Sequence, residues 1–206
     1  MTALEKSKYT LEEYFELIKK GEGRLEYWDG EVFDMSGASK EHYAIEGNLF
    51  LMLGLQLRAR GCQAFSPTTP VKVPAYPPYR YPDLSALCGK AVFEKIGGID
   101  ALTNPSVIIE ILSPSTEAFD RGDKFSYYQS IPSFREYVLI AQHRPHVALL
   151  LKQDDGSWRY NEYNDLADEV RLSSIDCRVR LVEIYEGVNF EQAPKEEPFQ
   201  PRSFGN

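Results

Sequence analysis

Two acidic residues are the strongest candidates for chemistry in this sequence. Glu110 lies inside the apolar run Val107–Leu112, and an isolated ionised carboxylate in an apolar interior is costly. It must therefore be paired, protonated, solvated or bound to a cation. Asp83 follows Pro82 at the start of a second apolar stretch, "YPDLSALC". Two carboxylates on neighbouring strands suit Mg²⁺, because this cation prefers oxygen ligands and often uses only one or two protein carboxylates.

Lys124 is the candidate for a positive charge beside these acids. It lies one turn after Asp120 in "DRGDKFSYYQS", and a helix that returns over the Glu110 strand would bring it to the carboxylates. A bound metal ion polarises a phosphoryl oxygen and lowers the pKa of a water molecule. A nearby ammonium stabilises the charge that develops in the transition state. The set favours phosphodiester hydrolysis.

Each of these residues also has a purely structural interpretation. Glu110 can pair with a buried Lys or Arg, Asp83 can start a strand or cap a turn, and Lys124 can be a solvated helix residue. Asp120 reads mainly as a helix N-cap, since Asp123 follows three residues later in a pattern like a capping box.

The run around Glu110 predicts a central strand. Strand residues alternate between two faces, so Glu110 shares a face with Ile108 and Leu112, whereas Val107, Ile109 and Ile111 point the other way. Both faces are apolar, which is typical of a strand covered on both sides.

Helices and strands alternate early in the chain, and strands dominate later. This order indicates a mixed α/β sheet with helices packed on it. We predict helices over residues 11–20, from Ser36 or Ser39 to Gly61, and in a segment that ends near Ser130. The predicted strands lie in "RLEYWDGEVFDM", a hairpin with an Asp-Gly turn, and in "CQAF", "PVKV", "YPDLSALC", "REYVLIA", "HVALLLK", "WRYNEY" and "CRVRLVEIY". Residues 1–189 are expected to form one domain, and the polar residues 190–206 a disordered tail.

Composition and charge limit the classes of function. The 206 residues carry a net charge of −8, which is unfavourable for nucleic-acid binding, because phosphate neutralisation supplies much of that affinity. The stretch from residue 58 to residue 80 nevertheless contains no acid and predicts a local basic patch, with a solvated face as the alternative. Its four basic residues are Arg58, Arg60, Lys72 and Arg80.

The cysteines and the apolar segments bear on location. Cys62, Cys88 and Cys177 are odd in number and far apart, which argues against both a zinc site and a disulfide framework. No window approaches the roughly 18 apolar residues of a membrane span, and the first residues lack a secretory signal. We therefore expect a cytoplasmic, reducing location and no membrane partner.

The motif set as a whole resembles one family. The succession "YPD", "IIEILSPST", "DRGDKFSYYQ" and "PSFREYVLIA", together with the upstream "RLEYWDGEVFDMSGASKEHYAI", is similar to the Uma-type (Uma-two) family of endonucleases. That family belongs to the PD-(D/E)XK restriction-endonuclease-like superfamily. The resemblance covers roughly Thr10 to Phe190. Motifs of other enzyme classes, such as a P-loop, a GxSxG elbow or HExxH, are absent from the sequence.

The resemblance implies a restriction-endonuclease-like mixed β-sheet core flanked by helices, with additional antiparallel strands. It implies an endonuclease that depends on Mg²⁺ or Mn²⁺ and cuts DNA rather than RNA, and a homodimer. Asp83 and Glu110 become catalytic metal ligands. The lysine that usually stands two residues after the second acid is Leu112 here, so the catalytic lysine maps to Lys124 on the following helix.

Two further points follow from the resemblance. The additional active-site residue is expected from the early hairpin or the long helix, where the candidates are Glu26, His42 and Glu46. Leu112 and the acidic net charge also leave an alternative, in which the fold is kept as a binding or regulatory module without turnover.

Overall fold

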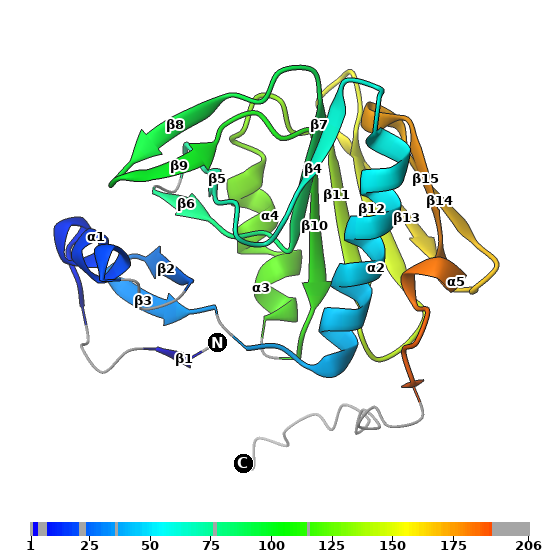
Figure 1. Cartoon of the computed structure of the whole chain (residues 1–206), viewed down its shortest axis with the longest axis horizontal. Helices are drawn as coiled ribbons and strands as arrows, with labels where there is room; N and C mark the ends of the chain where they lie inside the picture. Colours follow the sequence, from blue (N-terminus) through cyan, green and yellow to red (C-terminus); the bar gives the residue numbers. More distant parts are fainter. Residues whose placement is uncertain are drawn as a thin grey trace, which may run out of the picture.

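A mixed six-stranded sheet forms the centre of the protein (Figure 1). We analysed a computed structural model, which describes residues 2–3, 8–20, 24–35, 37–75, 78–114 and 116–190. The strand order is β13-β12-β11-β10-β7-β4, in which only β10 and β11 pair in parallel. The strands are β4 (Cys62–Phe65), β7 (Leu84–Cys88), β10 (Val107–Leu112), β11 (Glu136–Ala141), β12 (Val147–Lys152) and β13 (Trp158–Tyr163).

Both faces of this sheet are covered. On one face lie the long helix α2 (Lys40–Leu57), the hairpin β14 (Glu169–Leu172) and β15 (Cys177–Arg180), the 3₁₀ turn Ser173–Ile175 and the short helix α5 (Leu181–Ile184). On the other face lie α3 (Glu117–Arg121) and α4 (Asp123–Tyr128), followed by the buried Ile131 and Phe134. All six residues of β10 are buried, which confirms the prediction of a central strand.

A smaller layer lies beside α3 and α4 (Figure 1). It contains α1 (Leu11–Lys19), the three strands β1 (Thr2–Ala3), β2 (Leu25–Trp28) and β3 (Glu31–Asp34), and a four-stranded sheet. The strands of that sheet are β5 (Val71–Lys72), β6 (Tyr79–Arg80), β8 (Phe93–Ile96) and β9 (Ile99–Leu102). Tyr14, Leu25 and Tyr79 are fully buried between these elements.

Local sequence signals explain the early elements. Thr10 and Glu13 form the predicted capping box at the start of α1, which satisfies backbone donors that a helix leaves open at its N-terminus. Asp29 (φ 44°) and Gly30 (φ 90°) close the β2–β3 hairpin, as a type I′ turn requires. Ser39 caps α2 by accepting a hydrogen bond from the His42 N–H. Ser36, the other candidate for this cap, lies outside the described residues.

Some predicted elements differ in the structure. The helix expected to end near Ser130 is two short helices separated at Gly122. The segment "CRVRLVEIY" is a strand only to Arg180, because the next four residues form α5. The hairpin β8–β9 was not predicted, since three of the four residues of β8 are exposed and give no apolar alternation. Of the expected tail, all but Phe190 lies outside the described residues.

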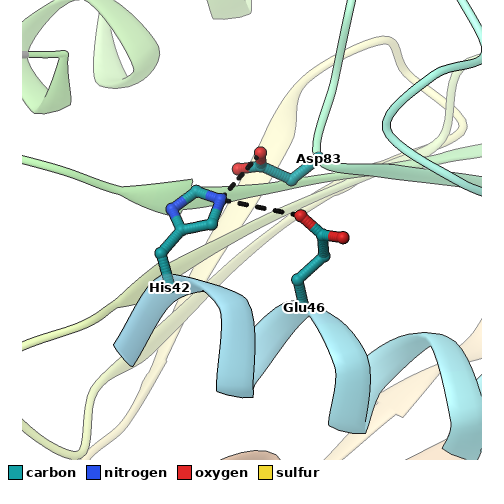
Figure 2. Close-up of side chains that lie close together, drawn as sticks. All are labelled: His42, Glu46 and Asp83. Atoms are coloured by element: carbon teal, nitrogen blue, oxygen red, sulfur yellow. Dashed lines mark hydrogen bonds and ion pairs between the residues drawn. The ribbon is translucent and has the colours of Figure 1, made fainter. Parts of the chain in front are cut away.

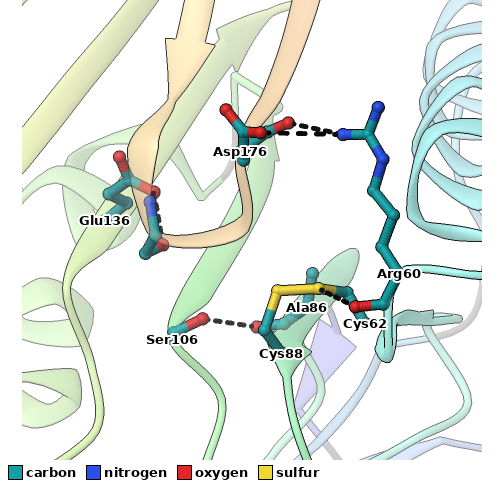
Figure 3. The surroundings of a disulfide bond; sticks show 8 residues. Arg60, Cys62, Ala86, Cys88, Ser106, Glu136 and Asp176 are labelled. Carbon is teal, nitrogen blue, oxygen red and sulfur yellow. Dashed lines mark hydrogen bonds and ion pairs between the residues drawn. A yellow bond between two sulfur atoms is a disulfide. The ribbon is translucent and has the colours of Figure 1, made fainter.

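The prediction that the cysteines form no disulfide is wrong for one pair. Cys62 and Cys88 are bonded (Figure 3) and are direct partners in the antiparallel β4–β7 ladder. The Gly89 N–H donates to the Gly61 carbonyl at 2.7 Å, so the cysteines form a non-hydrogen-bonded pair, in which the side chains approach most closely. Their separation of 26 residues concealed this register. Among the described residues, no helix has both the length and the apolar character to cross a membrane.

Reduction of this disulfide is expected to lower the free energy of unfolding by about 2–4 kcal/mol, because the bond restricts the unfolded chain over a loop of this size. Denaturant unfolding with and without a thiol reductant measures the difference. The Cys62→Ser/Cys88→Ser protein is the control and should unfold identically under both conditions. Equal stability of oxidised and reduced wild-type protein would contradict the expectation.

Candidate active site

The site begins where two strands separate. In the antiparallel pairing of β7 with β10, Leu84 lies opposite Ile109, so the next position of the register sets Asp83 beside Glu110. The ladder ends there, and the Ile111 N–H donates instead to Asp83 Oδ2 at 2.7 Å. The Asp83 carboxylate therefore replaces a strand partner, which fixes its position and holds β7 and β10 together at the point of separation.

Helix α2 brings two further polar side chains to Asp83 (Figure 2). His42 and Glu46 are four residues apart and so share one helix face. His42 Nε2 lies 3.0 Å from Asp83 Oδ1 and 4.0 Å from Glu46 Oε2. One ligand atom from each of the three side chains lies within 4.8 Å of the others. We refer to His42, Glu46 and Asp83 as the histidine–carboxylate cluster.

The charges in this cluster shift two pKa values. Burial disfavours the charged form of His42, but the hydrogen bond to Asp83 and the charges of Asp83 and Glu46 outweigh burial and raise its pKa. Burial and the charge of Asp83 raise the pKa of Glu46. The cluster thus gathers negative charge, which a proton on His42 offsets.

Glu110 lies in a second group on the other side of the sheet. Its Oε1 accepts a hydrogen bond from Tyr128 Oη at 2.9 Å and contacts Lys124 Nζ at 2.8 Å. Lys124 Nζ also lies 3.2 Å from Asp120 Oδ1. Glu110, Asp120 and Lys124 are each only 3% exposed. Glu110 therefore pairs with a buried lysine, as its structural interpretation expected. That lysine is Lys124, which the sequence also predicted as the positive charge beside the acids.

One lysine among several acids leaves this group acidic. Burial raises the pKa of Glu110 well above its ordinary value, an effect that Lys124 opposes and that Asp120 and Asp83 reinforce. Burial alone would lower the pKa of Lys124, but the charges of Glu110 and Asp120 raise it well above its ordinary value. Lys124 is consequently held as an ammonium.

The break between α3 and α4 positions Lys124. Gly122 has φ −109° and ψ −97°, so the second helix starts afresh at Asp123. A Cβ on Gly122 would come within 3.2 Å of the Ala118 carbonyl oxygen. Tyr137 on the neighbouring β11 donates a hydrogen bond to the Asp120 carbonyl at 2.9 Å and holds the end of α3 against the sheet.

The two groups line a common cavity of about 260 Å³. Its walls contain His42, Asp83, Glu110, Asp120 and Lys124. Arg24, Ser39, Ser113 and Thr116 also line it. Glu46 joins through its contact with His42. The three residues predicted from the motif, Asp83, Glu110 and Lys124, thus meet in one cavity although they come from three different elements.

Three charged residues of the cavity, Arg24, Asp34 and Asp120, escaped the sequence reasoning. Asp120 was interpreted as an N-cap, yet it is buried inside α3 and pairs with Lys124. Its spacing of four residues from Lys124 was the available signal, since this spacing allows an ion pair on a helix. Arg24 precedes a strand, and nothing in its local sequence distinguishes it.

Of the three candidates for the additional residue, His42 lines the cavity, Glu46 contacts His42, and Glu26 lies outside the cavity. Glu26 is fully buried and accepts hydrogen bonds from the Tyr81 N–H at 2.6 Å and from Trp28 Nε1 at 3.1 Å. Arg80 Nε lies 3.8 Å from its carboxylate. These contacts give Glu26 a structural role beneath the β2–β3 hairpin.

The structure removes Arg80 from the basic patch predicted from residue 58 to residue 80. Arg80 is fully buried and cannot reach a phosphate. Lys72 pairs with Glu94 at 2.6 Å, and Arg60 donates to the Asp176 carbonyl at 3.0 Å (Figure 3). Arg58 is exposed but follows His42 by 16 residues on the same helix, which separates them by about 24 Å along the helix axis.

Comparisons with known proteins agree on the fold. The model of the Uma2 family, described as "Putative restriction endonuclease", matches residues 11–180. Two proteins of Synechocystis sp. (strain ATCC 27184 / PCC 6803 / Kazusa) are similar in sequence. "Uncharacterized protein slr1290" is 31% identical over 183 residues, which are 89% of this chain and 94% of that protein. "Uncharacterized protein sll1609" is 30% identical over 164 residues, 80% of this chain and 92% of that protein.

A solved structure has the same architecture. The crystal structure of a "putative nuclease belonging to DUF820" from Anabaena variabilis ATCC 29413 has a TM-score of 0.69 to this chain. The match covers 86% of this chain and 98% of that one, at 17% sequence identity. The expected α/β class, a mixed sheet flanked by helices, is therefore confirmed.

The pKa of His42 should depend on Asp83. In the wild-type protein it is expected above the ordinary value of 6.5. In Asp83→Asn it should fall below that value, because burial remains while the main opposing charge is lost. In the wild-type protein, the His42–Asp83 pair contributes stability that is complete below pH 6.5 and is lost as pH rises through the folded-state pKa of His42. NMR titration of the His42 ring, with Asp154→Asn as control, measures the shift, and an unchanged His42 pKa in Asp83→Asn would contradict this account.

Lys124→Met should destabilise the fold by about 3–5 kcal/mol at pH 8, because it leaves two buried carboxylates without their counter-ion. The loss should be smaller at pH 5, since protonation of a carboxylate with a raised pKa removes the uncompensated charge. Denaturant unfolding at both pH values tests this, with the exposed Lys90→Met as the control. A loss of equal size at pH 5 and pH 8 would assign the effect to packing instead.

Proposed function

Because the chain belongs to the Uma2 family, we propose that it is a metal-dependent endonuclease that hydrolyses phosphodiester bonds, with DNA as its substrate. The observation that carries the proposal is the meeting of two different charged groups in one cavity. His42 and Asp83 lie at one wall, with Glu46 4.0 Å from the His42 ring, and a lysine held as an ammonium by two buried acids lies at the other.

The histidine–carboxylate cluster has donors that fit a divalent metal ion. His42 Nε2 lies 3.0 Å from Asp83 Oδ1 and 4.0 Å from Glu46 Oε2, and both distances are within the roughly 4.2 Å that separates opposite ligands of an ion bound at about 2.1 Å. Carboxylates suit Mg²⁺ and Mn²⁺, whereas imidazole is more typical of transition metals. The mixed set therefore favours Mn²⁺ over Mg²⁺. An ion bound there would polarise a phosphoryl oxygen and lower the pKa of a water molecule.

Asp83 is central to this assignment. One oxygen is fixed by the Ile111 N–H and the other faces His42, so the carboxylate is oriented before any ligand arrives. Such preorganisation is what a metal ligand or an electrostatic catalyst requires. Glu110, which we predicted to share the metal with Asp83, receives both of its hydrogen-bonding contacts among the described residues at Oε1. Its Oε2 is the atom that would act as the further ligand.

Lys124 is the residue that we assign to the transition state. Its ammonium has three donors, and Glu110 and Asp120 accept two of them. The third donor can bind a phosphate oxygen or orient the attacking water. Glu110, Asp120 and Tyr128 act as positioning residues, since they hold the ammonium in place and keep it protonated.

The substrate must approach a cavity rich in acids. Arg24 lines the same cavity, and its charge partly opposes the rise in the pKa values of His42 and Glu46. An arginine suits phosphate recognition, because its guanidinium presents several donors in a fixed plane. We assign Arg24 to the DNA backbone, in place of the basic residues that lie elsewhere.

A second candidate function rests on the pairing of Glu110. Lys124 and Tyr128 satisfy this carboxylate within the chain, so its burial is explained without a metal ion. A protein that binds nucleic acid without turnover would be consistent with that pairing.

Metal-dependent cleavage of supercoiled plasmid DNA tests the proposal. Wild-type protein with Mn²⁺ or Mg²⁺ should nick or linearise the plasmid, and Lys124→Met should lower the rate at least about 100-fold, as loss of a transition-state contact does. Asp83→Asn and Glu46→Gln should also lose Mn²⁺ binding in calorimetric titration. Asp154→Asn, which removes an exposed carboxylate, is the control for both assays. A single-stranded RNA of matched length tests the preference for DNA.

The outcomes separate the two candidates. Metal binding with cleavage that Lys124→Met lowers about 100-fold, under conditions in which that variant is folded, supports the nuclease. Metal binding without cleavage of any nucleic acid favours the module without turnover. Failure of wild-type protein to bind Mn²⁺ would remove the basis of both the metal site and the proposed mechanism.

A further inference from the structure

Helix α2 is apolar on its outer face as well as on its inner face. The inner residues Ile45, Leu49, Leu53 and Leu57 are buried against the sheet. On the opposite side, Tyr43, Phe50, Leu51 and Leu55 remain 53%, 43%, 62% and 63% exposed. Gly47 and Gly54 are the other exposed residues between positions 43 and 55. We call these six residues the outer face of α2. No charged residue interrupts it.

Packing among the described residues does not require the two glycines on this face. A Cβ added at Gly47 or Gly54 would meet no atom within 4 Å, and both residues lie in the middle of a regular helix. Glycine destabilises a helix interior relative to alanine, because it has more backbone freedom to lose. Glycine on a helix surface does allow another backbone to approach closely. The glycines therefore indicate a partner that packs on α2.

We propose that the outer face of α2 is the interface of a homodimer, in which α2 packs antiparallel against α2 of a second copy. In a two-fold interface both copies use the same surface. Two residues that face each other across the antiparallel helices therefore always have residue numbers with the same sum. An axis between Phe50 and Leu51 places Gly47 opposite Gly54 of the second copy. It also sets Tyr43 opposite Arg58, an arrangement that suits a cation–π contact.

The absence of charge on this face favours a second copy as the partner, and the exposed apolar area supplies part of the interface. The chain carries a net charge of −8, so two copies repel each other over most of their surfaces, and an uncharged face is where that repulsion is weakest. The four large side chains together expose about 400 Å² per copy, roughly half of what a standard interface buries on each partner.

The neighbouring helix α5 can supply more area. Asn48 of α2 donates to the Ile184 carbonyl of α5 at 3.0 Å, and Val182 on the same short helix is 47% exposed. The inference goes beyond the proposed nuclease function and does not depend on it, because it rests on the surface of α2 alone.

Sedimentation equilibrium of the full chain is the first test. Wild-type protein should be a dimer at micromolar concentration, and Leu51→Glu should raise the dimer dissociation constant at least about 100-fold, because it buries two like charges at the axis. Val92→Glu, which changes an exposed apolar residue beside β8, should leave the dimer intact. A monomeric wild-type protein, or a dimer that Leu51→Glu does not weaken, would overturn the proposal. Leu55→Lys provides a second variant if Leu51→Glu fails to fold by circular dichroism.

Cysteine cross-linking tests the antiparallel register. Leu51→Cys lies near the axis and should form an intermolecular disulfide on mild oxidation. Tyr43→Cys alone should not cross-link, since the same residue of the second copy lies about 22 Å away along the helices. A mixture of Tyr43→Cys and Arg58→Cys should yield the mixed dimer. Efficient cross-linking of Tyr43→Cys with itself would mean a parallel arrangement and would overturn the proposed interface.

Discussion

The ion pair between Glu110 and Lys124 is the interaction on which this structure depends. A carboxylate in the middle of the central strand is tolerable only with a counter-ion and hydrogen bonds. Lys124 at 2.8 Å and Tyr128 at 2.9 Å supply them. Both come from α4, so this helix must pack on one particular part of β10. Because the buried charge of Glu110 needs a partner, it fixes where the layer that contains α4 packs on the sheet.

The separation of β7 from β10 gives the site its second wall. A central sheet normally pairs all its backbone groups, yet the ladder ends at Leu84 and Ile109. The Asp83 carboxylate accepts the hydrogen bond that a strand would have taken from Ile111. The same side chain faces His42 at 3.0 Å. The Asp83 carboxylate, which replaces the missing hydrogen bond between the strands, is therefore also oriented toward the cavity. No additional residue is needed to support it.

The sequence predicted much of the core because its signals are local. The run around Glu110, the Asp29-Gly30 turn and the Thr10 cap each depend on neighbouring residues, and each occurs as expected. The family motif also identified residues that meet in one cavity.

Long-range register explains most of what could not be predicted. The Cys62–Cys88 disulfide depends on which residues oppose each other in two separate strands. The burial of Arg80 depends on Glu26 in a hairpin more than fifty residues earlier. The spacing of Asp120 from Lys124 was present in the sequence, but an acid near the start of a helix can be an N-cap or an ion-pair partner. These two roles could not be distinguished without the break between the helices at Gly122.

Helix α2 contributes both to the cavity and to the proposed dimer interface. A helix that is apolar on two opposite faces is normally buried on both, yet only the inner face of α2 contacts the sheet in a single chain. Its inner side carries His42 and Glu46, and on its outer face the side chains of Phe50, Leu51 and Leu55 remain exposed. The glycines make this helix intrinsically weaker by roughly 0.5–1 kcal/mol each relative to alanine. Packing of a second copy on the outer face would offset that loss in the same helix that must hold His42 within hydrogen-bonding distance of Asp83. In the proposed dimer, the association of two copies and the geometry of the cavity are thereby coupled through the rigid helix α2.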